Sequence, residues 1–428
     1  MYKGVETLKK ITAVLIGAGN RGVTYGKYAL DNPFEIEFVA VAEPREATRE
    51  SFRQEHNIKV ESCYSTWEEL LSLPKLADCI LICTQDQMHY EPTMKALKLG
   101  YHVLLEKPMS IDPAQCVKMG KYAEENNRVF SICHVLRYTN FFSTLKNLLD
   151  EGQIGKLISV QHNENVGYWH QAHSFVRGNW RNSKESSPMI LQKCCHDMDI
   201  LRWLIGHECI NISSFGELTY FKAENAPAGA TKRCLDGCLV AKECLYYAPK
   251  TYLTSNIGWP TSVISADMSL DARTKALMEG PYGRCVYHCD NDVVDHQVVN
   301  MEFENQVTVA FTMCAFTKKC NRTIKLMGTK GEIRGDMEKG EIELINFSTG
   351  TETVMQLSNE ISGHGGGDYG IMEDFVKLVQ ADGVVEGRTS ATTSVQSHLL
   401  AFAAEKARVE KRVINMQAYW SDIISKIK

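Results

Sequence analysis

Apolar and polar residues alternate along the first 135 residues in a pattern that predicts strands and helices in turn. Short apolar or β-branched runs predict strands at 12–16, 37–42, 77–84 and 101–105. Helical spacing predicts helices at 21–30, 91–99 and 112–126. The last of these has Asp112 as its expected N-cap and Pro113 in its first turn. Such alternation predicts βαβ units and a parallel sheet covered on both faces.

The pattern changes after residue 135. Helices are predicted at 140–150 and 194–205, with a strand at 156–163 and a polar, aromatic stretch at 168–184 between them. Consecutive strands are then predicted at 297–303, 307–315, 323–327, 331–336, 341–346 and 351–356, and helices at 369–378 and 390–411. Runs of adjacent strands are typical of an antiparallel or mixed sheet.

Composition narrows the class of protein. The chain has 428 residues, 44% hydrophobic and 23% charged, which is typical of a globular protein with two or three domains. The net charge of −5 is spread without a basic stripe, which argues against nucleic acid or an anionic membrane as a partner. Several of the 15 cysteines, such as Cys79, Cys83 and Cys133, fall in apparent core segments. We therefore expect reduced thiols and a cytoplasmic protein.

The first predicted strand leads directly into a glycine-rich motif, so we interpret the apolar N-terminal stretch as a strand rather than a signal peptide. The motif is Gly17-Ala18-Gly19-Asn20-Arg21-Gly22, a G-x-G-x-x-G between a strand and a helix. Gly17 permits the tight turn, Gly19 lets the backbone approach a pyrophosphate, and Gly22 allows close packing of helix on strand. Asn20 and Arg21 open the helix, whose N-terminal N–H groups favour phosphate. This context predicts a dinucleotide-binding site.

Glu43 ends the second predicted strand, 21 residues after Gly22. A carboxylate there can accept hydrogen bonds from the ribose hydroxyls and would repel a 2′-phosphate, which favours NAD over NADP. Arg45 follows two residues later and could pair with a 2′-phosphate, so NADP stays open.

Six segments in this order resemble the Gfo/Idh/MocA family of sugar oxidoreductases: GAGNRG, the stretch from Thr84 to His89, VLLEKP, HVLRYTNFF, DEGQIGKL and HDMDILRWLIG. The resemblance covers nearly the whole chain. It implies a Rossmann domain in residues 1–135 and, in residues 136–428, an α/β domain with a large, mostly antiparallel sheet and a cysteine-containing insertion at about 225–290. It further implies NAD(P), a polyol, sugar or glycoside as substrate, and a homo-oligomer, a dimer or tetramer, formed through the open sheet face.

The resemblance also suggests catalytic residues. The lysine of the family's EKP motif approaches the reacting hydroxyl near the nicotinamide, and Lys107 matches it. A lysine at the carboxyl end of a parallel strand faces the crevice where ligands bind. Thr84, His89 and Glu106 are expected beside the cofactor. The alternative for Lys107 is a side chain that only caps the strand end, and Pro108 makes a cis peptide bond possible at this turn.

His196 occupies the position of a second catalytic residue. Many family members have an aspartate four residues before this histidine, but the chain has Gln192 there, which cannot ionise. Either Lys193 takes over part of the polar role or His196 acts with Lys107 alone. The alternative is a structural or capping histidine. Asp199 and Arg202, on the helix body, are expected to be structural.

Candidate substrate contacts come from two segments. Tyr168, Trp169, His170, Arg177 and Arg181 lie in the aromatic stretch, and sugars need both flat rings and fixed donors. Alternatively this loop packs across the sheet with Trp180 in the core, or the two arginines bind a substrate carboxylate or phosphate. His364 and Asp368 follow from a GHGG segment like that of glycoside-processing members, although Asp368 could simply cap the next helix.

A cysteine cluster allows a metal site. Cys234, Cys238 and Cys244 lie close in sequence, and Cys285 and Cys289 follow with His288 between them. Thiolates spaced in this way could hold a structural zinc ion, with an ambiguous fourth ligand. The alternative is reduced cysteines in an insertion.

Three functions are compatible with the sequence. The first is reversible oxidation of a secondary hydroxyl of a sugar or glycoside, with C3 of a pyranoside favoured and Lys107 or His196 taking the proton. The second is redox-neutral glycoside cleavage, in which oxidation, elimination, water addition and re-reduction recycle NAD. The third is a non-catalytic NAD(H)-sensing protein.

Overall fold

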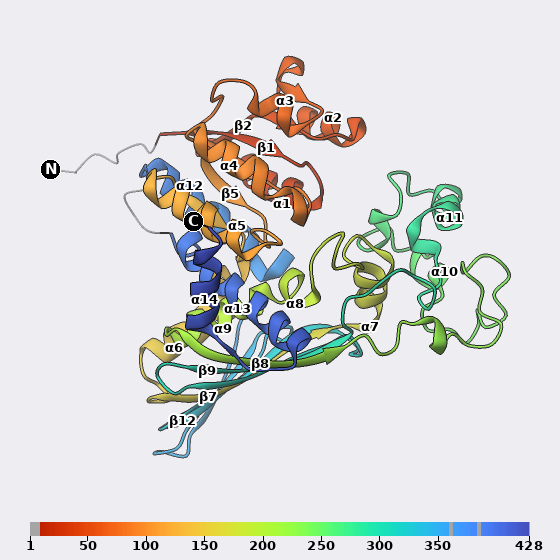
Figure 1. Cartoon of the computed structure of the whole chain (residues 1–428). Coiled ribbons are helices and arrows are strands. Elements are labelled where there is room, and N and C mark those ends of the chain that lie inside the picture. The colour runs from red at the N-terminus through yellow and green to blue at the C-terminus, as the bar shows by residue number, and fades with distance from the viewer. Residues whose placement is uncertain (1–8, 359–362, 383–386, 428) are drawn as a thin grey trace.

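The computed structural model describes residues 9–358, 363–382 and 387–427, with only the backbone described at residues 363 and 364. Its strands form two sheets, one of six and one of nine strands. Figure 1 shows the six-stranded sheet with its helices on one side of the molecule and the nine-stranded sheet on the other. This arrangement confirms the predicted fold class.

The N-terminal sheet is parallel throughout, in the order β3-β2-β1-β4-β5-β6. Its strands are β1 (Ile11–Ile16), β2 (Ile36–Ala42), β3 (Cys63–Tyr64), β4 (Cys79–Ile82), β5 (His102–Leu105) and β6 (Phe130–Ile132). Its helices are α1 (Asn20–Asp31), α2 (Glu46–Glu55), α3 (Trp67–Leu71), α4 (Tyr90–Lys98) and α5 (Pro113–Glu125). Asp112 caps α5 as predicted, because its carboxylate accepts from the N–H groups of Ala114 and Gln115. Because β1, β4 and β5 are neighbouring parallel strands, their carboxyl ends meet at one edge of the sheet.

Four N-terminal elements were not predicted from the sequence: α2, β3, α3 and β6. α2 buries only Phe52, so its sequence carries little apolar periodicity. β6 has only three residues, too few for a pattern. α2 and β6 are therefore held by tertiary contacts rather than by local sequence.

The C-terminal sheet is mixed, in the order β14-β13-β12-β11-β7-β10-β9-β8-β15. Among the described strands of this sheet, β7 and β10 form the single parallel pair. The strands are β7 (Leu157–Val166), β8 (Cys209–Glu217), β9 (His296–Phe303), β10 (Thr308–Cys314), β11 (Cys320–Gly328), β12 (Gly331–Asp336), β13 (Glu341–Asn346), β14 (Glu352–Gln356) and β15 (Ile414–Asn415). The mostly antiparallel sheet is therefore confirmed, although β8 and β15 were not predicted.

Helices cover one face of this sheet and join the two halves. The longer ones are α6 (Asn140–Asp150), α9 (Cys195–Ile205), α12 (Gly367–Gln380), α13 (Ala391–Glu410) and α14 (Met416–Ser425). In Figure 1, α9, α13 and α14 lie between the large sheet and the Rossmann half. Ile371, Met372 and Phe375 of α12 share an apolar core with Leu15 of β1. The parallel sheet thus ends near residue 135, but its covering layer includes a helix from the C-terminal end.

The insertion lies between β8 and β9 and contains the helices α10 (Ala248–Tyr252) and α11 (Leu270–Glu279). Figure 1 shows the insertion beside α7 (Tyr168–His170), beyond one end of the large sheet. Its apolar residues form two small clusters of their own, one of which includes Ala172 and Val176 from the aromatic stretch. Among the described residues, no helix has the length and hydropathy needed to cross a membrane.

Candidate functional site

The glycine motif forms the turn between β1 and α1. Gly17 has φ +88°, and a Cβ there would lie 2.6 Å from the carbonyl oxygen of Cys83. A Cβ at Gly22 would lie 2.2 Å from the carbonyl oxygen of Gly17. Only glycine fits at these two positions, because the turn touches β4 on one side and itself on the other.

Gly19 is different, because its open side is where a phosphate would approach. Its φ of −71° suits any residue, and a Cβ there would meet only the Arg45 guanidinium, at 3.5 Å. As N-cap of α1, Gly19 provides no side-chain cap, and the first turn of α1 contains no acidic residue. The N–H groups at this helix start are therefore available to an anion, so the residues present fit the pyrophosphate of a dinucleotide.

Glu43 lies at the end of β2 beside this loop. Its carboxylate accepts from the backbone N–H of Ala18 at 2.9 Å and from Nε of Arg45 at 2.7 Å. Burial raises the pKa of Glu43. The hydrogen bonds from Arg45 and Ala18 lower it by more than burial raises it, so the net shift is downward. The predicted ribose-binding carboxylate is therefore charged and fixed next to the glycine loop.

A second carboxylate, Glu106, is buried at the end of β5. It accepts from Nε of Arg21 at 2.6 Å and from the Tyr25 hydroxyl at 2.7 Å. Arg21 also pairs with Asp368 at the start of α12. Burial raises the pKa of Glu106, but Arg21 and Lys107 outweigh burial and lower it. Asp368, predicted to contact substrate, is thus placed on the cofactor side as a partner of Arg21.

The turn after Glu106 is held by a buried histidine. Nδ1 of His89 lies 2.6 Å from the carbonyl oxygen of Pro108, and Nε2 lies 3.1 Å from that of Thr84. The peptide bond between Lys107 and Pro108 is cis. His89, predicted beside the cofactor, therefore joins the β4 and β5 ends rather than pointing outward.

Lys107 reaches from the Rossmann half to the C-terminal half. Its Nζ donates to the carbonyl oxygen of Gln192 at 2.9 Å, at the end of α8 (Met189–Gln192). Burial raises the pKa of the Cys195 thiol to about 12, and Lys107 is the strongest opposing influence. Lys107 therefore lies close to the first turn of α9, where His196 is buried. The two predicted catalytic residues are brought to the same region of the domain boundary.

A buried network of charges lies behind this region. Arg322 of β11 pairs with Asp197 at 2.8 Å and with Glu164 of β7 at 2.6 Å. Asp197 also contacts Nε2 of His162 at 2.8 Å, and Glu164 pairs with Lys193 at 3.2 Å. Sequence analysis missed Glu164 and Arg322, because ion partners on separate strands leave no local pattern.

His170 links the aromatic stretch to this region. Burial lowers its pKa well below the usual value, and Lys193, His173, Lys107 and Arg322 lower it further. The imidazole is therefore neutral at pH 7. Its Nδ1 lies 3.4 Å from Sγ of Cys320. Tyr168, Trp169 and His170 are all half-buried, as residues that can meet a ligand should be.

The two predicted substrate-binding arginines are occupied within the protein. Arg177 is buried and donates to the carbonyl oxygens of Arg284 and Tyr246. Arg181 forms a two-point ion pair with Asp290. Both side chains therefore anchor the insertion to the end of the aromatic stretch. The side chain of His364 lies outside the described part of the structure.

The structure does not support the predicted zinc site at Cys234, Cys238 and Cys244. These thiols and Cys285 line one small cavity. However, in residues 9–358, 363–382 and 387–427 no three His, Cys, Asp or Glu side chains form a group that could hold a metal ion. Instead, Cys234 packs in an apolar cluster with α10 and α11, and its sulfur accepts from the N–H of Ala248. Cys234 therefore acts as a small apolar side chain here.

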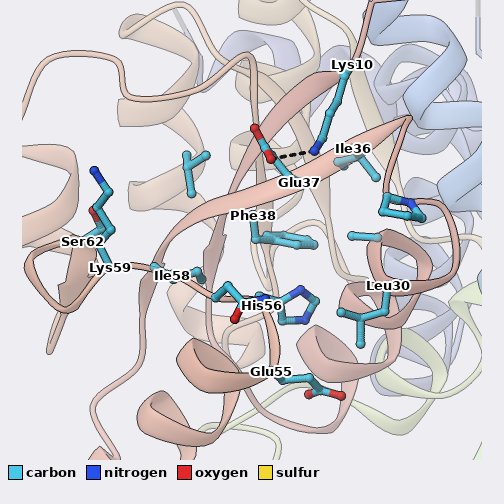
Figure 2. A pocket seen from close by; sticks show the side chains of 14 residues that line it. Lys10, Leu30, Ile36, Glu37, Phe38, Glu55, His56, Ile58, Lys59 and Ser62 are labelled. Carbon is cyan, nitrogen blue, oxygen red and sulfur yellow. Dashed lines mark hydrogen bonds and ion pairs between the residues drawn. The ribbon is translucent and has the colours of Figure 1, made fainter.

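A separate cavity of about 580 Å³ lies on the Rossmann half, lined by side chains that include Leu30, Phe38 and His56 (Figure 2). Lys10 and Glu37 pair at its edge at 2.6 Å. It lies at the amino ends of β1 and β2, whereas the glycine loop follows the carboxyl end of β1. It is therefore not part of the cofactor site.

A parallel Rossmann sheet with an open glycine loop, joined to a second domain that meets Lys107, defines a two-domain, NAD-binding oxidoreductase. The chain matches the Gfo/Idh/MocA oxidoreductase family, NAD-binding Rossmann fold, over residues 11–134. It also matches that family's C-terminal alpha/beta domain over residues 146–416. The protein therefore belongs to the Gfo/Idh/MocA oxidoreductase family.

Curated relatives are distant. YteT of Bacillus subtilis (strain 168), named as an oxidoreductase, is 22% identical over 72% of this chain and 74% of its own length. A 2,7-anhydro-N-acetylneuraminate hydratase of Escherichia coli (strain K12) is 32% identical over 31% of this chain and 34% of its own length. An inositol 2-dehydrogenase/D-chiro-inositol 3-dehydrogenase of Lactiplantibacillus plantarum is 25% identical over 38% of this chain and 43% of its own length. The last two matches thus span less than half of each relative.

Solved structures share the fold over nearly the whole chain. A levoglucosan dehydrogenase in complex with NADH and levoglucosan has a TM-score of 0.71 at 16% identity, covering 95% of this chain and 99% of its own. An oxidoreductase from Agrobacterium radiobacter, in complex with NAD+, L-tartaric acid and magnesium, has a TM-score of 0.70 at 14% identity, covering 96% and 99%. At these identities the likeness concerns the fold.

Proposed function

We propose that the protein transfers hydride between a nicotinamide cofactor and a secondary hydroxyl of a sugar, polyol or glycoside, with C3 of a pyranoside favoured. The observation that carries this proposal is the position of Lys107. Its amine lies at the end of β5, next to the predicted cofactor residues, and contacts the C-terminal half beside His196. Printed names of relatives, including inositol and levoglucosan dehydrogenases, support a polyhydroxylated substrate.

Each group has a role in this reaction. The glycine loop and the start of α1 bind the pyrophosphate, and Glu43 binds the adenosine ribose and favours NAD over NADP. A bound nicotinamide would supply the hydride acceptor for the substrate carbon. Lys107 or His196 takes the hydroxyl proton, so that one hydride and one proton leave the alcohol as it becomes a ketone.

The substrate ring is proposed to lie between Lys107 and the aromatic stretch. Lys193, paired with Glu164, is assigned to donate to a substrate hydroxyl. Tyr168, Trp169 and His170 supply flat rings and a neutral imidazole. Gln192 contributes its backbone carbonyl rather than an ionisable side chain, so no acid–histidine dyad is assigned.

A substrate screen with Lys107→Met tests this function. Purified protein is given sugars, polyols and glycosides with NAD or NADP, and reduction is followed by absorbance with product NMR. We expect Lys107→Met to lower kcat by about 10³-fold, since general acid–base groups contribute 10²–10⁴. Lys98→Met, on the surface of α4 in the same half, is the control and should keep full activity. Near-full activity of Lys107→Met on the true substrate would show that the assigned role is wrong.

A second candidate is redox-neutral glycoside cleavage with recycled NAD. It is favoured by the E. coli relative, whose name describes a hydratase rather than a dehydrogenase. Oxidation at C3 acidifies the C2 hydrogen, so the aglycone can leave by elimination before water addition and re-reduction. Incubation of glycosides without added cofactor tests this candidate, because it predicts free sugar and no net NADH. The third function, NAD(H) sensing without catalysis, does not explain the placement of Lys107 near His196.

We also propose that the protein is a homo-oligomer, a dimer or tetramer. Phe215 of β8 and Val298 of β9 are exposed apolar side chains at paired positions of the large sheet. Large exposed apolar areas on monomers are uncommon, so a second copy of the chain is a suitable cover. Light scattering at several concentrations tests this assignment.

A further inference from the structure

Trp259 is an aromatic residue of the insertion that lies against the predicted substrate stretch. Its ring centroid is 5.4 Å from that of Trp169, 5.1 Å from His170 and 5.5 Å from His173. The three interplanar angles are 67°, 89° and 81°, so these are edge-to-face contacts. Residues about 90 positions apart in sequence thus form one aromatic wall, defined here as Trp169, His170, His173 and Trp259.

The wall begins at the proposed reaction site. His170 lies near enough to Lys193 and Lys107 for both to lower its pKa. Trp259 contacts His170 but comes from the insertion, which Figure 1 shows lateral to α7. The wall therefore extends from the proposed catalytic groups toward the insertion.

The wall is held in place before any ligand binds. His173 stacks on Tyr282 with centroids 4.8 Å apart, and its Nδ1 lies 2.8 Å from the Tyr252 hydroxyl. Arg177 ties the aromatic stretch to the insertion through the carbonyl oxygen of Tyr246. Despite these contacts, Trp259 keeps 44% of its surface exposed. A large aromatic side chain that is fixed and yet exposed is typical of a recognition surface.

The chemistry of the wall favours an uncharged ligand. Burial and Arg177 lower the pKa of His173 to about 4, so both imidazoles of the wall are neutral at pH 7. Thr254, Ser255 and Asn256, in the same loop as Trp259, are exposed and carry hydroxyl and amide groups. A flat apolar surface bordered by neutral polar groups matches the C–H face and the hydroxyl rim of a sugar ring.

We propose that Trp259, together with Trp169 and His170, binds a second ring of the substrate, adjacent to the ring that is oxidised. The inference rests on the proposed function, because that function places the reacting ring beside Lys107 and Lys193. Trp259 comes from the insertion and contacts His170 edge to face, so we assign it to a neighbouring sugar unit. The substrate class is then a glycoside of two or more sugar rings rather than a free monosaccharide.

Binding to an array of mono-, di- and oligosaccharides tests this inference without requiring turnover. Trp259→Leu keeps an apolar side chain in the insertion but removes the flat face, whereas Trp259→Tyr keeps an aromatic face. Leu270→Ala is the control, because Leu270 is 56% exposed in the same insertion and lies outside the wall. Thermal melts establish that all variants are folded.

We expect the wild-type protein to retain saccharides of two or more rings. Trp259→Leu should bind them about tenfold more weakly, and Trp259→Tyr and Leu270→Ala within about twofold of wild type. Monosaccharide binding should be equal in all four proteins. Equal binding of disaccharides by Trp259→Leu and wild type, or no retained saccharide of two or more rings, would overturn the inference. Binding that depends on Trp259 without any dehydrogenase activity would leave the inference standing and overturn only the proposed function.

Discussion

The cofactor side and the substrate side of this protein are built in different ways. On the cofactor side, the predicted binding groups belong to the backbone. Gly17 and Gly22 fit where any Cβ would collide, and Gly19 leaves its outer side open. On the substrate side, side chains from β7, α9 and β11 meet in the ion network of Glu164, Asp197 and Arg322. One site depends on chain conformation within six residues, and the other on pairing between distant segments.

The difference explains which substitutions each side tolerates. A site made of backbone survives changes of charge but not added volume, because its N–H groups stay in place while the space is fixed. A buried ion network survives small changes of shape but not loss of one charge, because the remaining charges are then unpaired and dehydrated. The predictions below test this contrast.

The largest effect is expected from Asp197→Asn. Asp197 is fully buried and faces Arg322 and His162, so its loss leaves buried Arg322 with Glu164 as its remaining carboxylate partner and removes the carboxylate that His162 contacts. Breaking such a buried pair costs about 3–5 kcal/mol of the free energy of unfolding. Asp290→Asn is the matched control, because it removes a half-exposed carboxylate paired with Arg181 and should cost about 1 kcal/mol or less. Urea unfolding at pH 7 measures both.

The same carboxylate predicts a pH dependence. Burial raises the pKa of Asp197, but Arg322 and His162 outweigh burial and hold it well below the usual range. Because the folded pKa is depressed, this stabilisation is complete above the unfolded pKa of about 4 and is lost as pH falls below it. The difference between wild type and Asp197→Asn should therefore shrink from pH 5 to pH 3. A difference that stays constant over this range would contradict the assignment.

The contrast also shows what the sequence could and could not predict. The glycine loop was predictable because it is a short motif whose geometry is local, and the positions of Glu43 and the EKP turn were predictable because each follows a predicted strand. Glu164, Arg322 and Trp259 were not, because their partners come from other strands or from the insertion and no local spacing reports them. Arg177 was assigned to substrate for its residue type and Asp368 for its place after the GHGG segment, but the structure gives both side chains internal partners.

Secondary-structure elements were likewise predictable only where the local sequence carries a pattern. Long elements with clear apolar periodicity, such as α6 and α13, were predicted closely. α2, with one buried residue, and the two-residue β15 were missed. Periodicity reports burial on one face, so an element that buries little gives little signal.

Gly19→Ala should have the next largest effect. The added methyl would stand where the pyrophosphate approaches, while φ −71° and a nearest neighbour at 3.5 Å leave the free protein unstrained. We expect NAD to bind about 30-fold more weakly, which corresponds to about 2 kcal/mol, with an unchanged melting temperature. Gly22→Ala is the comparison, because its methyl would collide with the Gly17 carbonyl and should lower the melting temperature as well. Titration of NADH fluorescence and thermal melts separate the two. Unaltered NADH affinity in Gly19→Ala would show that the loop does not bind the pyrophosphate.

The smallest effect is expected from Glu43→Gln, and it tests whether charge matters on the backbone side at all. Glutamine can still accept from the N–H of Ala18, so the loop should keep its shape. In the native protein Arg45 pairs with Glu43. Loss of the carboxylate charge in Glu43→Gln makes Arg45 available to a 2′-phosphate. We expect the ratio of kcat/KM for NAD to that for NADP to fall about tenfold, equivalent to about 1.4 kcal/mol. Arg45→Ala should move the ratio the other way, because it removes the cation that pairs with the Glu43 carboxylate. If neither variant changes the ratio, the choice of cofactor is set elsewhere, and the cofactor side depends on backbone geometry alone.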